Sequence, residues 1–402
     1  MKSKLLFLLL LLGSSYITAQ TVIENPPFET RQGSIHTISK IELSPTETRL
    51  TIRTVFRPQW WTSLDSLTYI YAPESKKQLY PLRIEGRKFG EQVTTPASGI
   101  IEDDCVITYP PLPEGTTRID WMDDNLNSET NTYGILLVKP QETKEQASLR
   151  KIHGNWQQAD AQNGWDIGIY DSLAIMDNRF WKYDLCRKQG KKFKLNLKDE
   201  TGEQCLLEIT QEKDGNLCIG KNGGKANKYI RAGRPQRNYA ATTAATAPQT
   251  AFFRKDTVHI RGFLDGYSPK LGFTTVLIYT DNHITNEGTP AVVTIHPDGR
   301  FESDFVVNYP GVHHLSMGNN WMTFYIRPGE TLMLYINWED HLDYLRQRRL
   351  KPMLTETLYM GPSSSINQEL MPCEPLFSKD YHIIQNACKT LIPVSYTHLR
   401  AH

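Results

Sequence analysis

Apolar residues in this chain recur at every second position over many short stretches, which is the periodicity of β-strands. In one such stretch, Leu50, Ile52 and Phe56 alternate with other residues, so an extended chain would present one largely apolar face. Pro58 ends this strand, because proline cannot donate a ladder hydrogen bond. Similar runs follow, with proline or glycine between them. Residues 30–140 are therefore predicted to form an antiparallel β-sandwich domain.

A second unit, residues 152–235, has shorter strand-like runs and frequent turns. Its strongest signal is Lys213-Asp214-Gly215-Asn216, because Asp-Gly supplies the positive φ angles of a type I′ hairpin turn. A two-residue turn at Asp214 and Gly215 places Cys218 opposite Gln211. The length and turn density of this unit predict a small meander or barrel.

Residues 240–250 are rich in alanine and threonine and are predicted to be a linker. Strand periodicity returns over residues 252–337 and predicts a second β-sandwich domain. Helical spacing then replaces it over residues 338–392, where Ser365 and Ser378 are candidate N-caps.

The last predicted helix has one apolar face, because successive apolar residues are three or four positions apart. They are Tyr381, Ile384, Cys388 and Leu391. The predicted fold class is therefore mainly β, with two antiparallel β-sandwich domains, a small β-barrel or meander between them, and a C-terminal helical segment.

Composition excludes several classes of protein. The chain has 402 residues, of which 39% are hydrophobic and 22% charged, which excludes a disordered polyelectrolyte, a coiled coil and a polytopic membrane protein. Lys and Arg number 45 and Asp and Glu number 44. The chain as a whole has no net field that would attract nucleic acid or an anionic membrane, and no nucleic-acid partner is predicted.

Residues 1–19 have the layout of a secretory signal peptide. Lys2 and Lys4 precede an apolar run from Leu5 to Leu12, and cleavage is expected after Ala19. The run is too short to span a bilayer, which takes about 20 residues, and no later stretch is long and apolar enough. The mature protein is therefore expected to be exported to the periplasm or cell envelope, without a transmembrane segment after cleavage.

The end of the chain departs from the pattern before it. Residues 394–402, which follow Pro393, closely resemble translated sequencing-adapter read-through. We expect this tail to be non-native. The chain would then be a truncated fragment of a polypeptide that continues beyond Ile392.

Cysteine spacing gives no redox motif. The six cysteines include no C-x-x-C pair, although an oxidising compartment would allow a disulfide among them. Cys205 is expected to be a small buried apolar residue of a β-core. The six are Cys105, Cys186, Cys205, Cys218, Cys373 and Cys388.

No other catalytic, cofactor-binding or metal-binding residue is predicted. His313 and His314 would face opposite sides of a strand and could not easily bind one ion. No nucleophile elbow, Walker loop or dinucleotide fingerprint occurs. The acidic runs Glu102-Asp103-Asp104 and Asp123-Asp124 are interpreted as solvated loops, and a glycosidase pair cannot be chosen from them.

Tryptophan is the other candidate for ligand chemistry. Five such residues could line a sugar or hydrophobic site, but core filling is the preferred interpretation, because large aromatics fill small β cores. Of the adjacent Trp60 and Trp61, one is expected to be exposed, since neighbours on a strand point to opposite faces. The five are Trp60, Trp61, Trp156, Trp165 and Trp181.

Ordered strings along residues 30–392 resemble the N-terminal region of exported thiol–disulfide interchange proteins of the TlpA type, which are thioredoxin-like. The strings are Phe56-Arg57-Pro58, Pro110-Pro111-Leu112-Pro113, Gly154-Asn155-Trp156, Phe180-Trp181-Lys182-Tyr183, the run from Gly262 to Phe273, Phe324 to Glu330, and Tyr359-Met360-Gly361-Pro362. In that family a thioredoxin-like domain with a W-C-x-x-C motif follows. No residue of this chain matches that motif.

The resemblance implies an accessory or scaffold region of an exported thiol–disulfide oxidoreductase, itself without the redox motif. Its partners would be envelope proteins with disulfides or thiols, and no cofactor is implied for this region. Two alternatives stay open, a free-standing envelope binding protein for glycan or protein partners and a purely structural envelope scaffold.

Overall fold

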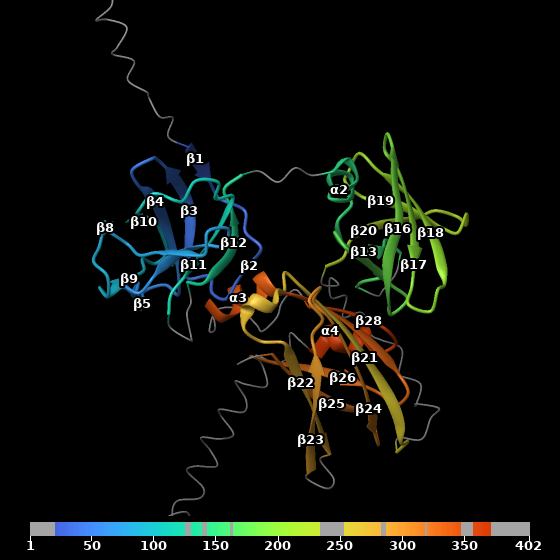
Figure 1. The fold of residues 1–402 in the computed structure, drawn as a ribbon. Coiled ribbons are helices and arrows are strands. Elements are labelled where there is room, and N and C mark those ends of the chain that lie inside the picture. The colour runs from blue at the N-terminus through green and yellow to red at the C-terminus, as the bar shows by residue number, and fades with distance from the viewer. Residues whose placement is uncertain are drawn as a thin grey trace, which may run out of the picture. The chain divides into compact units, whose positions relative to one another are not determined.

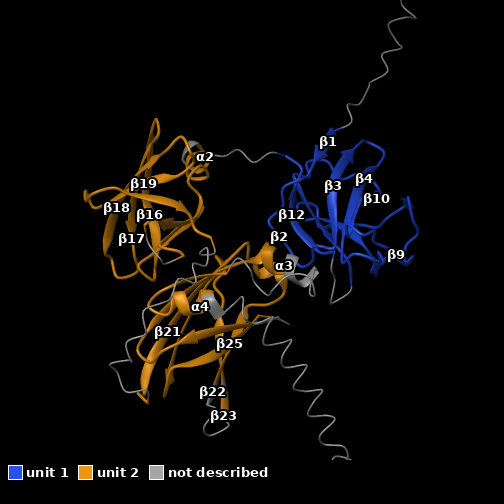
Figure 2. Ribbon diagram, turned by 180° about the vertical axis from the view of Figure 1, so that it is seen from behind, with its two compact units in different colours: residues 1–140 blue, residues 141–402 orange. Residues whose placement is uncertain are grey.

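The computed structural model describes the chain as two compact units, residues 1–140 and residues 141–402 (Figure 2). It is mainly β, with several antiparallel sheets, a barrel and few helices (Figure 1), so the predicted fold class is confirmed. The residues described are 21–124, 130–138, 143–160, 164–233, 253–282, 287–317, 320–346 and 357–370. The predicted signal peptide, the linker at 240–250, the last helix and the tail at 394–402 lie outside them.

Unit 1 is a sandwich of two five-stranded sheets. In spatial order, the first contains β1 (Thr21–Glu24), β3 (His36–Leu43), β4 (Thr48–Val55), β10 (Ile100–Tyr109) and β8 (Arg83–Glu85). The second contains β2 (Thr30–Arg31), β12 (Thr132–Leu136), β11 (Arg118–Met122), β6 (Tyr69–Ala72) and β7 (Lys77–Leu79). A short pair, β5 (Trp61–Thr62) and β9 (Val93–Thr94), stands beside them.

The core of unit 1 follows the predicted alternation. Leu50 and Ile52 are fully buried on β4 and contact the apolar residues of the opposite sheet. Trp121 is also fully buried, and its indole N–H donates a 3.0 Å hydrogen bond to the hydroxyl of Tyr109. Because its N–H has a partner, this indole buries a large apolar surface without leaving a hydrogen-bond donor unsatisfied.

Two acidic residues interpreted as solvated are instead buried. The register of β10 shifts between Ile101 and Cys105, and such a bulge re-aims a side chain. The Asp104 side chain is 4% exposed, and its Oδ2 lies 3.0 Å from Nη1 of Arg87, whose side chain is 2% exposed. Asp123 is buried too and accepts a hydrogen bond from Thr130.

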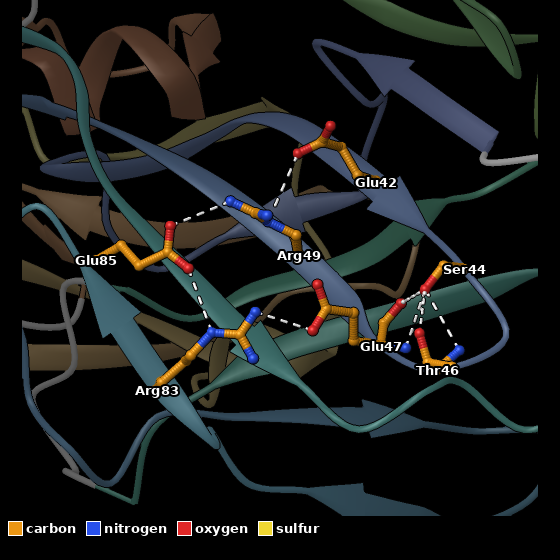
Figure 3. A network of polar contacts seen from close by, with 7 residues as sticks. All are labelled: Glu42, Ser44, Thr46, Glu47, Arg49, Arg83 and Glu85. Atoms are coloured by element: carbon orange, nitrogen blue, oxygen red, sulfur yellow. Dashed lines mark hydrogen bonds and ion pairs between the residues drawn. The ribbon is translucent and has the colours of Figure 1, made fainter.

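The outer face of unit 1 carries a ladder of ion pairs (Figure 3). Arg49 lies between Glu42, its cross-strand neighbour, and Glu85. Arg83 bridges Glu85 and Glu47. Exposed pairs of this kind each add little to stability. The Glu42–Arg49 pair joins the neighbouring strands β3 and β4, whereas the pairs with Glu85 and Arg83 reach β8 across β10.

Unit 2 begins with α2 (Lys144–Leu149). Thr143 and Gln146 form a reciprocal capping box at the N-terminus of this helix. A closed eight-stranded antiparallel barrel follows. Its strands are β13 (Gly154–Gln158), β14 (Ile167–Ile169), β15 (Leu173–Met176), β16 (Arg179–Gln189), β17 (Lys192–Lys198), β18 (Gln204–Gln211), β19 (Leu217–Lys221) and β20 (Asn227–Arg231). The predicted small barrel is therefore correct.

The β18–β19 hairpin differs from its prediction by one residue. Cys218 faces Thr210, not Gln211. The loop has three residues, 213–215, and among them only Gly215 has a positive φ, of 86°. A type I turn followed by a left-handed glycine closes such a loop, whereas the predicted type I′ turn would need a positive φ at Asp214 as well.

The second sandwich consists of two four-stranded sheets. One has the order β24 (Arg300–Val307), β21 (Asp256–Asp265), β27 (Thr331–Asn337), β28 (Leu358–Met360). The other has the order β23 (Glu287–Thr294), β22 (Thr275–Asn282), β25 (Gly311–Met317), β26 (Asn320–Ile326). Strands β21 and β27 pair in parallel, so this domain is not wholly antiparallel as predicted. A short 3₁₀ helix, η1 (Pro269–Leu271), precedes β22.

Among the described residues after 337, only some are helical. Helix α3 (Trp338–Arg346) and helix α4 (Ser364–Leu370) are present, but β28 lies between them and extends the sheet. Ser365 lies inside α4 and not at its cap, because the chain already turns at Ser363, whose carbonyl accepts from the N–H of Asn367. The Asn367 side chain then bonds the backbone N–H and carbonyl of Tyr325 in β26.

Candidate functional site

Three of the described cysteines, Cys105, Cys205 and Cys218, lie in environments that disfavour the thiolate. Burial raises the pKa of Cys105 to about 12 and also raises the pKa of Cys205, which lies in the barrel core as predicted. Cys218 donates a 3.1 Å hydrogen bond to Oε1 of Glu212, and this bond raises the Cys218 pKa. Nucleophilic cysteines need the opposite shift. Cys186 is half-buried.

Buried apolar side chains from all parts of the barrel form its core. Trp156 and Trp181 are buried among aliphatic residues. Their indole N–H groups donate to backbone carbonyls of Ile152 and Met176. Both tryptophans are therefore core residues, as the preferred interpretation predicted.

An aromatic seam joins the barrel to the second sandwich within unit 2. Tyr170 of the barrel stacks on Tyr335 of β27, with ring planes 8° apart and centroids 5.5 Å apart. Trp165 contacts the same Tyr335 ring at 5.9 Å. The Tyr335 hydroxyl donates to Oδ2 of Asp265 at 2.9 Å. The third predicted core tryptophan, Trp165, thus lies in this seam and not inside the barrel.

A pocket of about 330 Å³ opens at one mouth of the barrel. Its lining combines apolar and polar side chains, which is the usual composition of a small-molecule site. The apolar lining residues are Ile167, Met176, Leu207, Ile219 and Met360, and the polar ones are Gln158, Asp166, Asp177, Lys221, Lys225, Asn227 and Tyr229.

Charges of both signs line the rim of this pocket. Burial raises the pKa of Asp166, whose Oδ2 accepts a 2.7 Å hydrogen bond from the backbone N–H of Gln158. Lys221 forms an ion pair with Asp177, and Lys225 lies beside them in the lining. This arrangement can hold a small polar molecule that has both a donor and an acceptor end, but it contains no nucleophile–base pair for covalent chemistry.

A larger pocket of about 510 Å³ lies where the β15–β16 and β17–β18 turns meet β21 and β24. Its charged side chains mostly neutralise one another. Arg179 pairs with Asp199 at 3.1 Å, and Arg261 pairs with Glu302 at 3.2 Å. Because these charges have partners within the protein, the pocket has little net field for a ligand.

Exposed aromatics form a platform on unit 1. Trp60 is 44% exposed and Trp61 is 55% exposed. One of them was expected to be exposed and both are, because Trp60 lies before β5 and Trp61 begins that two-residue strand. Arg57 lies over the Trp60 ring at 4.7 Å, and Phe56 meets that ring edge-on.

The histidine pair lies on β25 as the sequence predicted. His313 is buried against the rings of Phe305 and Phe324, whereas His314 is half-buried near the hydroxyl of Thr323. Within the described ranges, no group of three or more His, Cys, Asp or Glu side chains is arranged to hold a metal ion.

Sequence patterns did not identify the residues that line the barrel mouth. Asp166, Asp177 and Lys221 come from separate strands and turns, and only closure of the barrel brings them together. No motif spacing encodes such a meeting. Trp60 and Trp61 were named from the sequence among the possible ligand residues, but core filling was the preferred interpretation, and their exposure contradicts it for these two.

Comparison with known proteins gives no assignment. No protein-family model and no curated protein sequence matches the chain. A solved structure described as a tetra-tandem repeat in the extending region of a large adhesion protein is similar over 79% of this chain and 76% of that one, at 10% identity and a TM-score of 0.10. A likeness at this level carries no argument. In the described part of the chain, no helix has the length and apolar character needed to cross a bilayer.

Proposed function

We propose that this chain is the N-terminal accessory region of an exported thiol–disulfide oxidoreductase, and that the described domains act as its scaffold without redox chemistry of their own. The main support for a non-catalytic role is that three cysteine thiols have raised pKa values. They are Cys105, Cys205 and Cys218. Disulfide exchange requires a thiolate and a resolving partner, and these three thiols are poorly suited to supply the thiolate.

The packed contact between barrel and sandwich supports a scaffold role. The seam around Tyr170 and Tyr335 is buried and hydrogen-bonded, and Arg300 of the sandwich reaches Glu200 of a barrel turn at 2.8 Å. Domains joined through a packed aromatic interface hold a fixed spacing better than domains on a flexible linker. Such a body would present a following redox domain to envelope proteins that contain disulfides or thiols.

The 402-residue chain is expected to reduce insulin no faster than the dithiothreitol supplied in the assay. The reason is that thiols with raised pKa values are mostly protonated near neutral pH. The turbidity assay measures this, with a thioredoxin as the positive control. Turnover that disappears in a Cys218→Ser variant would identify an exchange-competent thiol and contradict the proposal. Sequence recovered beyond Ile392 that ends without a C-x-x-C motif would contradict the assignment to this enzyme class.

A free-standing binding protein is the second candidate, and the exposed Trp60–Trp61 platform favours it. Sugar rings stack on exposed aromatic faces, and a neighbouring guanidinium such as that of Arg57 adds donors. On this candidate the chain would bind a glycan or a protein partner of the envelope through unit 1.

Replacing both Trp60 and Trp61 by alanine is expected to weaken glycan binding at least tenfold if the platform is the site. A glycan array would identify a ligand, and titration calorimetry would then compare the variant with the unmodified chain. The matched control is the double variant Tyr80→Ala, Leu82→Ala, which also removes two exposed apolar side chains of unit 1. Equal affinities for all three proteins would exclude the platform as the binding site.

A further inference from the structure

The outer face of the β16–β17 ribbon is strongly basic. On β17 the side chains alternate between buried Phe193, Leu195 and Leu197 and exposed lysines. Over residues 179–198 the chain has eight basic residues and a single acidic one. We name five of the exposed cations of this ribbon the basic face, leaving out Arg179, which pairs with Asp199 and Glu203, and Lys191 in the turn. The five are Lys182, Arg187, Lys192, Lys194 and Lys198.

Strand register sets like charges opposite one another on this face. Lys182 is the cross-strand partner of Lys198, and Arg187 is the partner of Lys194. Such pairs lie only about 5 Å apart at Cβ and repel each other. At the tip of the ribbon Lys188 has a lowered pKa, first through burial and then through the neighbouring Lys151.

Little acidic charge offsets this repulsion. Lys194 pairs with Glu208 of β18 at 2.7 Å. Across the described residues, no carboxylate forms an ion pair with Lys182, Arg187 or Lys198. Asp184 lies on the same strand near the bulge after Tyr183. The ribbon therefore keeps a local positive field although the whole chain has a formal net charge of only +1.

We propose that the basic face binds an anionic lipid surface. The face belongs to the convex outside of a closed barrel, where β16, β17 and β18 run side by side (Figure 1), and neither pocket of unit 2 is lined by its five cations. A convex ribbon without a groove suits a broad, flat partner. Neighbouring lipid phosphates would offset the repulsion within the Lys182–Lys198 and Arg187–Lys194 pairs.

The residue types favour lipid over other polyanions. Four of the five cations are lysine, which acts as a hydrated point charge, whereas specific recognition of single phosphates or carboxylates favours arginine. The exposed large apolar residue on β16 is the aliphatic Leu185, so the face lacks the aromatic platforms on which single-stranded nucleic acid and sugars stack. Each lysine near an anionic leaflet strengthens binding roughly fivefold.

The test is co-sedimentation of the full chain with vesicles. We expect binding to vesicles of equal parts phosphatidylglycerol and phosphatidylcholine, no binding to phosphatidylcholine alone, and loss of binding between about 0.05 M and 0.5 M NaCl through screening. The double variant Lys182→Glu, Arg187→Glu should bind at least tenfold more weakly. The control Lys77→Glu, Lys88→Glu changes net charge equally at exposed positions of unit 1 and should bind nearly as well as the unmodified chain.

Stability measurements separate binding from folding. The reversed residues would face Lys198 and Lys194, so the binding variant should unfold in urea at the same or a higher denaturant concentration. If the charge-reversed variant fails to fold, the Lys182→Gln, Arg187→Gln variant replaces it in the co-sedimentation test and should also bind more weakly than the unmodified chain. The proposal is overturned if phosphatidylglycerol vesicles do not sediment the chain, if the binding and control variants lose affinity equally, or if only a soluble polyanion such as dextran sulfate binds.

Discussion

Replacing Arg87 by methionine is expected to lower the free energy of unfolding of unit 1 by about 3–5 kcal/mol. The variant would leave the Asp104 carboxylate buried without its cation, since both side chains are almost fully excluded from solvent. One oxygen of Asp104 would keep the 2.6 Å hydrogen bond from Thr54, which cannot compensate a buried charge. Urea unfolding followed by tryptophan fluorescence and circular dichroism measures the loss.

The double variant Arg87→Met, Asp104→Leu is the control for this prediction. Replacing both members of a buried ion pair by apolar residues is often close to neutral, so the double variant should recover most of the stability lost in the single one. A single variant within about 1 kcal/mol of the unmodified protein would show that Asp104 reaches solvent or protonates at little cost.

Acidification from pH 7 to about pH 4.5 is expected to cost unit 1 about 2–3 kcal/mol through His36 alone. Burial first, and then the charge of Arg87, lower the pKa of His36 to about 3. The ring lies within 2.9 Å of the Thr54 hydroxyl and 3.2 Å of the Ser63 carbonyl.

The sign of this effect follows from linkage. The unfolded chain binds a proton on His36 near pH 6.5, whereas the folded chain does not until about pH 3. The contribution of His36 is therefore complete above pH 6.5 and is lost progressively as the pH falls towards 3.

Denaturation curves of the unmodified chain and of a His36→Asn variant, each at the two pH values, measure how much of the stability lost on acidification is due to His36. The variant should be less stable at pH 7, where it loses the ring contacts with Thr54, Thr62 and Ser63, but should lose less stability on acidification. Equal acid sensitivity in both proteins would mean that carboxylates, and not His36, control the acid response.

Strand periodicity predicted the mainly β fold because one face of each strand is buried. Leu50 and Ile52 show this in unit 1, and Phe193 and Leu195 show it in the barrel. Periodicity did not predict the inward turn of Asp104, because a bulge shifts the phase of the alternation. It also gave no sign of the parallel β21–β27 pair, since pairing partners depend on contacts far apart in sequence.

The candidate sites also differ in how far the sequence could predict them. The basic face was not predicted, because the overall count of charges is balanced although residues 179–198 contain eight basic residues and one acidic residue. The barrel-mouth pocket was not visible, because residues such as Asp166 and Lys221 meet only when β13 closes on β20. Local charge density is therefore readable from a single sequence, whereas convergence of distant side chains is not.

The position of β21 has a consequence for how the second sandwich assembles. β21 is the first strand of that domain, yet it lies between β24 and β27 in the finished sheet, and His259 on it pairs alongside Thr331 on the last long strand. Contacts of such high sequence separation raise the contact order and slow folding. Until residues 331–337 have emerged, one edge of β21 has no partner and is open to pairing with other chains. A slow refolding phase, with aggregation that rises with protein concentration, is the expected kinetic signature of this topology.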